Sequence, residues 1–553
     1  MTELKITKLN KKFSAMKNNA ADWENSWEDI RRWERPTRGR FNESEVKNGA
    51  EQNHQDIVNG KIYILVRTFA DGMYAGMTNP AIKWFKLELE NEELNENNEV
   101  RLWLEKAENL IFKIFSKSNF YETLRSLYEE LGLFGVAGAL INDDFETVIR
   151  MRGFTIGEYY FDNDYSGRVN SMAREFVMTV SQVVEEFGLD NASEDTKNKW
   201  NVKDFDKNVT VRHCIYPRKE YDDSKKDNLN MPFVSVYWEP NSNIDDNILL
   251  ESGYKLFPVI APTWNKTATS DVYSNNSPGW DCLGDAKMIQ VEEKDKAINL
   301  ALIAQTPMLI DASIDDWDLN PNGVTRGDLL TGNNPLVRPV EVVQADVAKI
   351  DASIKEIEQR MGEHWYTNFF TMFLDNDDPR RTATEIIKRD NEKMVGLASV
   401  LTIINNEALS PSIEITFDKI LEGELLEEPP EIMQGSKWKI SYISMIAQAQ
   451  KMIGTGNIEQ VAGFVGNMLA VFPDVVDNYD SDEAYRIYAD KSGISPKITR
   501  SKEAVLDIRL KREQAQKQAQ QQEQAAQMVE GAKVLSETEI KPNTALTELT
   551  GGA

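Results

Sequence analysis

The sequence has few cysteines and few histidines. Its 553 residues include two cysteines, Cys214 and Cys282, and three histidines. Two cysteines so far apart exclude a disulfide framework and the paired spacing of a structural zinc site. We therefore expect synthesis in a reducing cytoplasm. The motifs GxSxG, HExxH and GxxxxGK[ST] are also missing, so nothing favours an enzyme, a bound metal or a cofactor.

Long hydrophobic runs are missing as well. No window reaches the eighteen or so consecutive apolar residues that a membrane helix needs. The N-terminal stretch MTELKITKLNKKFSAMK is polar and has no apolar centre typical of a signal peptide. We expect a protein that has no membrane partner and is not exported.

Positive charge is scarce relative to negative charge. Lysine and arginine total 63, aspartate and glutamate total 90, and the net charge is -27. A protein that coats nucleic acid needs clustered cations to bind phosphates, so any contact with nucleic acid should be loose. Twelve tryptophans and 22 phenylalanines are typical of a folded chain. The length permits two to four domains, or one elongated subunit of an assembly.

One stretch, Asp281 to Gln305, predicts an uninterrupted helix of roughly seven turns. The residues expected on its packed side are Leu283, Ala286, Ile289, Ala297, Leu300, Ala301 and Ala304. Its other faces carry Asp285, Lys287, Glu292, Glu293, Lys294, Asp295 and Lys296, which would meet water or a polar channel. The helix should end at Thr306, before Pro307. A β-rich insert to residue 343 and a second long helix, 344–373, complete a hairpin with a distal tip.

The remaining chain predicts a mixed α+β fold that is predominantly helical. The expected helices are 57–75, 97–115, 119–131, 181–187, 383–405, 413–421 and most of 445–534. The expected strands include 84–89, the segment up to 141 and 439–442, with short strands and turns between 148 and 237.

Tryptophans and arginines occur together near the N-terminus. The tryptophans are Trp23, Trp27 and Trp33, and the arginines are Arg31, Arg32, Arg35, Arg38 and Arg40. Either the tryptophans dock an N-terminal helix, or the arginines reach a partner subunit or DNA. Both readings remain open at this point.

Three short patterns have plain structural explanations. The glycines of 132–138 follow a helix and precede a strand, which is the reverse of a dinucleotide-binding loop. The residues from Asp162 resemble a calcium loop, but its twelfth position is Ala173 where a bidentate glutamate is needed, so a hairpin turn is preferred. His213 and Cys214 should fill a core from opposite faces of a strand.

Several stretches, taken in order, resemble the portal, or head-to-tail connecting, proteins of short-tailed bacteriophages. They are 67–73 (RTFADGM), 78–80 (TNP), 84–85 (WF), 119–121 (NFY), 131–135 (LGLFG), 157–160 (GEYY), 277–279 (SPG), 284–287 (GDAK) and 382–386 (TATEI). The resemblance covers about residues 20 to 515. It implies a closed ring, usually of twelve subunits, at one capsid vertex, through which DNA is packaged and later ejected.

The resemblance also implies how the chain is divided into the structural regions of a portal subunit. They are an N-terminal arm and wing (1–280), a first stem helix (281–306), a β-rich clip (307–343), a second stem helix (344–374), a tunnel loop (375–381), a wing helix and return strand (382–444), a helical crown (445–535) and a tail expected to be disordered (536–553). The implied partners are further copies of the chain, the major capsid protein, tail adaptor proteins, the terminase motor, scaffold or internal core proteins and double-stranded DNA. The implied place is the portal vertex of the virion.

The implied channel residues form two groups. The tunnel loop offers Asp375, Asp377, Asp378, Arg380 and Arg381, and the stem offers Asp285, Glu292 and Lys296. The two arginines would either touch passing phosphates or pair with a neighbouring subunit's aspartates. An acidic channel would let DNA slide, because like charges repel. The alternative function is an acidic helical scaffold or adaptor that never conducts DNA.

Overall fold

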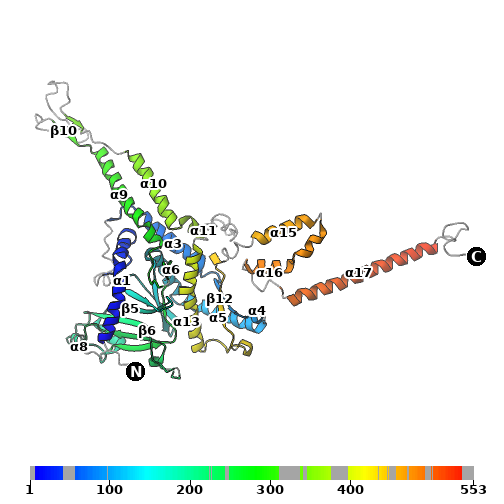
Figure 1. Ribbon diagram of the computed structural model, residues 1–553, viewed down its shortest axis with the longest axis horizontal. Coiled ribbons are helices and arrows are strands. Elements are labelled where there is room, and N and C mark those ends of the chain that lie inside the picture. The colour runs from blue at the N-terminus through cyan, green and yellow to red at the C-terminus, as the bar shows by residue number, and fades with distance from the viewer. Residues whose placement is uncertain are drawn as a thin grey trace, which may run out of the picture. The chain divides into compact units, whose positions relative to one another are not determined.

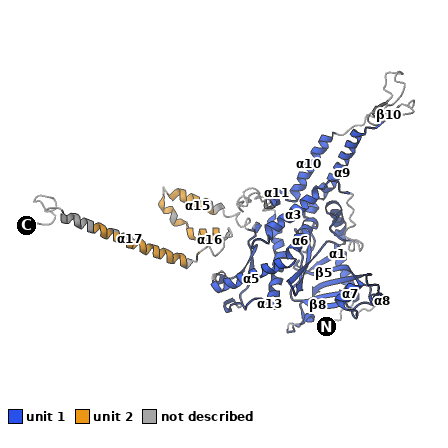
Figure 2. Cartoon of the chain, turned by 180° about the vertical axis from the view of Figure 1, so that it is seen from behind, with its two compact units in different colours: residues 1–453 blue, residues 454–553 orange. Residues whose placement is uncertain are grey.

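The structure is a computed structural model in which two compact units are distinguished, residues 1–453 and 454–553 (Figure 2). It describes residues 6–41, 56–95, 97–222, 224–225, 227–242, 248–268, 270–310, 337–339, 346–374, 397–433, 435–444, 446–447, 456–469, 472–491, 500 and 502–537. The fold is mixed α and β and mostly helical, as the sequence predicts (Figure 1).

The larger sheet of the first unit is antiparallel and has the strand order β4-β5-β6-β7-β8. Its strands are β4 (Tyr159–Asn163), β5 (Val169–Thr179), β6 (Asn208–Pro217), β7 (Phe233–Trp238) and β8 (Leu250–Tyr254). The turn between β4 and β5, where the calcium pattern lies, is a hairpin turn with Gly167 at φ 83°. His213 and Cys214 on β6 are both buried, as expected.

Helix α1 (Ile6–Glu34) lies along this sheet (Figure 1). Its buried residues recur every three or four positions, because they follow one face of a helix. They are Ile6, Leu9, Phe13, Met16, Ala20, Trp27, Ile30 and Glu34. The docked N-terminal helix expected from the tryptophans is therefore confirmed for Trp27.

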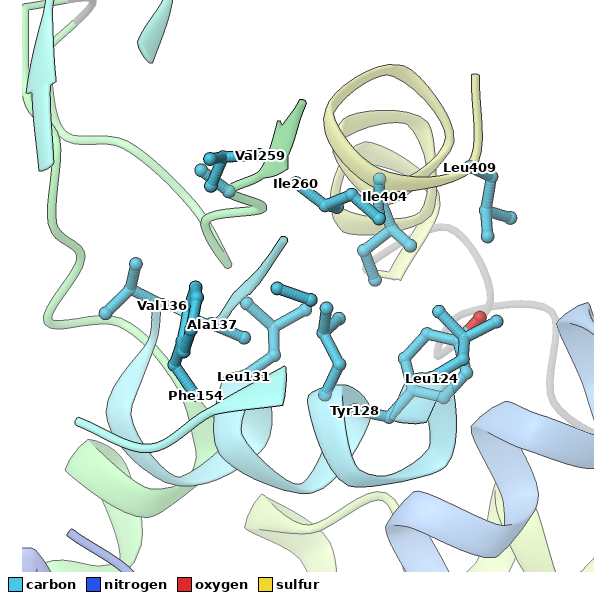
Figure 3. Packing of buried hydrophobic residues seen from close by; sticks show 14 of the residues in the cluster. Leu124, Tyr128, Leu131, Val136, Ala137, Phe154, Val259, Ile260, Ile404 and Leu409 are labelled. Atoms are coloured by element: carbon cyan, nitrogen blue, oxygen red, sulfur yellow. The ribbon is translucent and has the colours of Figure 1, made fainter. Parts of the chain in front are cut away.

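The centre of the first unit is built around helix α6 (Phe120–Phe134). One face of α6 packs against the sheet β3-β2-β9, formed by β2 (Gly138–Asp144), β3 (Val148–Phe154) and β9 (Val259–Ile260). Figure 3 shows Leu124, Tyr128 and Leu131 of α6 beneath Ile260 and Ile404 in this core. Gly135 ends α6 in the left-handed conformation at φ 76°, so the glycine pattern here is a helix cap.

Strand β1 (Phe85–Leu89) pairs with β12 (Trp438–Tyr442), and both strands are predicted by the sequence. Phe85 lies opposite Tyr442, 357 positions later in the chain. The two-stranded sheet thus joins the first hundred residues to the end of the first unit.

The remaining elements of the first unit are mainly helical. They are α3 (Lys61–Met77), α4 (Glu92–Asn95), α5 (Asn98–Lys117), α7 (Val180–Phe187), α8 (Glu194–Asn201), α9 (Pro278–Ala304), α10 (Val347–His364), α11 (Thr367–Leu374), α13 (Ser410–Glu422), the strands β10 (Met308–Ile310) and β11 (Val337–Pro339), and short helical turns at Asn228–Asn230, Asn405–Leu409 and Glu431–Met433. The second unit holds α15 (Gly456–Leu469), α16 (Ser481–Lys491), α17 (Lys502–Glu537) and a turn at Pro473–Asn478.

Two helix predictions are wrong in their boundaries. The second long helix, expected from 344 to 373, is divided into α10 and α11 at Trp365 and Tyr366. The helices expected to be separate around 405–413 are continuous, because a π-helical turn at Asn405–Leu409 leads directly into α13. Most of the predicted insert, 311–336 and 340–343, lies outside the described residues, as do residues 344–345 and the segment 375–396.

Candidate functional site

The candidate site is the hairpin of α9 and α10, which lie side by side and lead away from the sheets towards β10 (Figure 1). The helix predicted at 281–305 is confirmed as α9, which starts three residues earlier and has Gln305 as its C-cap. Ser277 precedes Pro278, a residue that fits the first turn of a helix because it needs no amide donor.

The root of α9 is fixed against the end of α6. Ser277 Oγ donates to the carbonyl of Leu133 at 3.2 Å, and Trp280 Nε1 donates to the carbonyl of Phe134 at 3.2 Å. A Cβ added at Gly279 would lie 2.3 Å from the oxygen of Leu133, so only glycine allows this approach. The hairpin therefore rises from a rigid base.

Charged and polar side chains join α9 to α10 along one line, which we call the polar seam. Asp285 Oδ1 accepts a hydrogen bond from Arg360 Nη2 at 2.8 Å. Further out, Ser353 Oγ donates to Glu292 at 2.9 Å, and Lys296 Nζ donates to Asp351 at 2.7 Å. The seam holds the two helices in register.

The contacts of the seam change the acidity of its members. The hydrogen bond from Lys296 lowers the pKa of Asp351, and the same contact raises the pKa of Lys296. The hydrogen bond to Asp285 likewise raises the pKa of Arg360. All three shifts favour the charged forms of Asp351, Lys296 and Arg360.

A collar of residues 58–61 braces the same hairpin. Gln290, buried on α9, accepts from the amides of Val58 and Asn59 at 2.7 and 2.8 Å. Asn59 Nδ2 in turn donates to Glu293 of α9 and Glu358 of α10. The buried part of α9 ends at Gln290.

Beyond Gln290 the packing differs from the sequence prediction. Ala286 and Ile289 are buried as expected, whereas Ala297, Leu300, Ala301 and Ala304 are exposed. The reason is that the outer half of α9 has left the core and touches mainly α10. A second row of apolar residues, spaced three and seven positions apart, is also uncovered. We call Met288, Val291 and Ile298 the apolar strip; they are 45%, 56% and 57% exposed.

The break between α10 and α11 allows aromatic residues on both sides of it to pack against α3 at the base of the hairpin. Tyr366 adopts φ 51°, and the fully buried Trp365 contacts Phe69 of α3 edge to face, with ring centroids 5.4 Å apart. Phe370 of α11 packs on Phe69 in the same way at 5.2 Å. A straight helix could not place both aromatic rings against α3.

The structure brings the three stem candidates together in one row of contacts, whereas it does not describe the loop candidates. Asp285, Glu292 and Lys296 all belong to the polar seam, so each has a partner on α10. The tunnel-loop candidates Asp375, Asp377, Asp378, Arg380 and Arg381 lie outside the described residues. The apolar strip was missed, although its spacing of three and seven is visible in the sequence.

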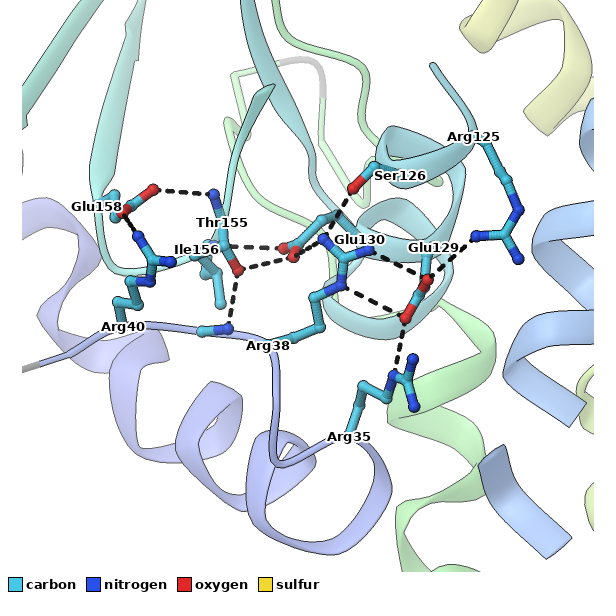
Figure 4. Close-up of polar contacts among 11 residues, drawn as sticks. Arg35, Arg38, Arg40, Arg125, Ser126, Glu129, Glu130, Thr155, Ile156 and Glu158 are labelled. Carbon is cyan, nitrogen blue, oxygen red and sulfur yellow. Dashed lines mark hydrogen bonds and ion pairs between the residues drawn. The ribbon is translucent and has the colours of Figure 1, made fainter. Parts of the chain in front are cut away.

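The arginines after α1 form a separate network within the first unit (Figure 4). Arg35 Nε donates to Glu129 at 2.9 Å, and Arg38 binds both Glu129 and Glu130 through its guanidinium group. Arg40 binds Glu158 at 2.6 Å. These contacts favour an internal role for the three side chains over a reach towards DNA.

Two buried carboxylates of this network, Glu129 and Glu130, differ in acidity. Burial alone would raise the pKa of Glu129, but the paired guanidinium groups of Arg38 and Arg35 lower it below its usual value. Burial raises the pKa of Glu130 to about 7, although Arg38 and the hydroxyl of Thr155 oppose the shift. The network is thus held by one permanent anion and one that titrates near neutrality.

A metal centre and a membrane-spanning helix are two further kinds of feature that a site could involve. Within the described residues, no group of three or more acidic, histidine or cysteine side chains is arranged to hold a metal ion. Among these residues, too, no helix is both long and apolar enough to span a membrane.

Comparison with known proteins gives a consistent answer. Residues 6–499 match the family model described as bacteriophage head to tail connecting protein. The chain is 34% identical to the portal protein of Salmonella phage epsilon15, over 100% of this chain and 99% of that protein. It is 35% identical to a probable portal protein of Bordetella phage BPP-1, over 99% and 98% of the two chains. The chain belongs to the family of bacteriophage head-to-tail connecting proteins.

Proposed function

We propose that this protein is a portal subunit, a structural component that forms a ring at one vertex of the capsid and joins head to tail. The observation that carries the proposal is the match to two portal proteins along nearly the entire chain. DNA would enter through the ring during packaging and leave through it during ejection. The net charge of -27 supports this role, since a channel for sliding DNA should not grip phosphates.

In this proposal the hairpin is the stem of the ring. Residues 281–306 and 344–374 form the stem helices, 307–343 the clip, 1–280 and 382–444 the wing, and 445–535 the crown. The polar seam supports the assignment, because Asp285, Glu292 and Lys296 of α9 find their partners on α10, within the hairpin. Asp285, Glu292 and Lys296 would then tune the potential near the channel rather than bind phosphate directly.

The apolar strip supports the closed ring. Exposed apolar side chains on a helix gain roughly 25 cal/mol for every Å² that a neighbour covers. Each subunit of a ring has one neighbour on each side, and such contacts close when the rotation per subunit divides a full turn. We propose that the strip Met288, Val291 and Ile298 faces the adjacent stem.

The proposed surroundings follow from the role. The ring, of twelve copies in this proposal, would contact the major capsid protein, tail adaptors, the terminase motor during packaging, and scaffold or internal core proteins. Double-stranded DNA would pass through it, and the ring would be part of the virion. An acidic scaffold or adaptor is the alternative, and it predicts no axial channel.

Electron microscopy of the purified chain tests the proposal directly. We expect closed rings with an axial hole, and Ile298→Asp should reduce their yield strongly, because it places a charge in the strip. Val202→Asp is the matched control, since Val202 is also apolar and 74% exposed but follows α8, far along the chain from the hairpin. A stable monomer under all salt conditions would argue against a portal.

The last part of the proposal concerns the role of the tunnel loop, residues 375–381. Arg380 and Arg381 either touch passing phosphates or pair with a neighbour's aspartates. With both changed to alanine, DNA contact predicts normal rings but shorter or poorly retained packaged DNA. An interface role predicts fewer or less stable rings before DNA is present. Normal rings with full-length, retained DNA would contradict both roles.

A further inference from the structure

Within the part that the structure describes, the second unit has almost no core of its own. Among its described side chains, only Ala489 is buried. Large apolar side chains remain exposed instead: Val461, Phe464, Leu469, Phe472, Tyr485 and Ile487. Ordering a backbone without compensating burial costs free energy, so the described part of this unit has little to stabilise it by itself. These described surfaces therefore favour a partner that covers them.

One of the surfaces is a groove between α15 and α16, with a volume of about 360 Å³. Its lining is apolar with two carboxylates: Ile458, Val461, Tyr479, Ala484 and Ile487, together with Asp480 and Glu483. The groove therefore suits an aliphatic side chain carried on a basic helix.

A surface of matching character lies on α17. Leu506 and Leu510 are one helical turn apart on the same face and are 58% and 57% exposed. We call this pair the leucine ridge. Arg509 Nη2 binds Asp482 Oδ1 of α16 at 2.6 Å, which ties the start of α17 to α16. The ridge remains uncovered despite that contact, so it does not fill the groove of its own chain.

The charges of the two surfaces are complementary. Residues 456–491 contain seven acidic and two basic residues, whereas residues 502–517 contain three acidic and five basic residues. The groove segment is thus strongly negative and the ridge segment positive. Opposite charge favours their association and disfavours pairing of groove with groove.

We propose that the groove between α15 and α16 receives the leucine ridge of a neighbouring copy of this chain. Groove and ridge are different surfaces, so the contact is heterologous and can continue from copy to copy until it closes a ring. The proposal rests on the ring assembly proposed above and adds the contact that orders the second unit. The second unit then folds fully only when neighbours are present.

Cross-linking in assembled rings tests this pairing. Chains with Ala484→Cys are co-assembled with chains carrying Leu506→Cys and treated with a short bismaleimide. The native Cys214 and Cys282 are buried and should not react. We expect a covalent dimer in the mixed rings, because each chain supplies only one reactive thiol.

The matched control replaces Leu506→Cys with Met528→Cys, a position 77% exposed on the same helix but six turns further along. Its dimer yield should be about tenfold lower, since the reagent cannot span that separation. Equal yields, or no dimer in intact rings, overturn the proposed contact while leaving the portal role intact. A parent chain that forms no rings would instead contradict the portal role itself.

Hydrogen exchange of the full chain provides an independent test. In rings, Leu506→Glu combined with Leu510→Glu should lower the protection of α15 and α16 amides by about tenfold, because carboxylates are repelled by the acidic groove. Lysine at both positions keeps the favourable charge and should cost less protection. Unchanged protection in both variants, or a larger loss with lysine, would overturn the proposal.

Discussion

At the scale of single residues, the arginine–glutamate network decides how firmly the arm after α1 is held. Arg38 pairs with Glu129 and Glu130, which are only 2% and 1% exposed. Removing Arg38 leaves the buried carboxyl group of Glu130 without its cationic partner, whereas Glu129 keeps Arg35. We therefore expect Arg38→Ala to destabilise the chain by about 3 kcal/mol.

A second arginine offers a control for this prediction. Arg32 binds Asp56 at 2.7 Å, but its side chain is largely exposed to water. Arg32→Ala should cost far less stability, as is usual for a surface pair that water screens. Urea unfolding of both variants measures the difference, and equal losses would show that burial of the glutamates contributes nothing.

Glu34 illustrates the opposite situation, a buried carboxyl group to which the described residues offer no partner. Neither of its side-chain oxygens has a hydrogen bond to a described residue, and burial raises its pKa well above the usual value. A raised pKa adds stability below the ordinary glutamate pKa of about 4.3, and this stability is lost as pH rises through the folded-state value. Since Glu34 continues the apolar row of α1, Glu34→Met should raise the melting temperature.

The sign of the shift makes this prediction pH-dependent. The gain from Glu34→Met should be larger at about pH 8 than at about pH 5, because the buried charge is costly only at high pH. Glu28→Met, an exposed position on the same helix, should show no such trend. Thermal melts at both pH values provide the measurement, and a gain that shrinks with rising pH would contradict it.

At the scale of elements, α9 is the part that cannot be interrupted. Proline at position 297 would remove one backbone hydrogen bond and clash with the preceding turn, at about 3 kcal/mol or more. Ala297 is exposed, so the loss comes from the helix rather than from side-chain packing. We expect Ala297→Pro to abolish ring formation in light scattering, whereas Ala297→Ser should assemble normally.

The elements also show what the sequence can and cannot predict. α9 is recognisable because its signals are local: apolar spacing and the Thr306-Pro307 stop. The division at Trp365 and Tyr366 is not recognisable, because it depends on aromatic contacts with Phe69, about 300 positions earlier.

The partners of Arg38 could not be predicted from the sequence either, since Glu129 lies 91 positions away. The sequence places Asp285, Glu292 and Lys296 correctly on the polar faces of α9. Their partners on α10 could not be predicted, because the pairing depends on how the two helices pack.

At the scale of the whole molecule, the acidic charge sets the affinity for DNA. In the proposed ring, twelve copies of a 63.0 kDa chain would give roughly 750 kDa and a large negative total charge. The ring should therefore bind duplex DNA weakly at physiological salt, and fluorescence anisotropy can measure this. Nanomolar, sequence-selective binding would contradict a channel made for sliding.

The pairing of β1 with β12 has a consequence for the timing of synthesis. β1 leaves the ribosome early, yet its partner strand is made 357 positions later. At about 5–20 residues per second, the ribosome needs roughly 20 to 70 s to bridge that interval. During this time β1 has an open edge, and the first unit cannot close. Neighbouring chains on one messenger therefore cannot join through a finished first unit before β12 has been made.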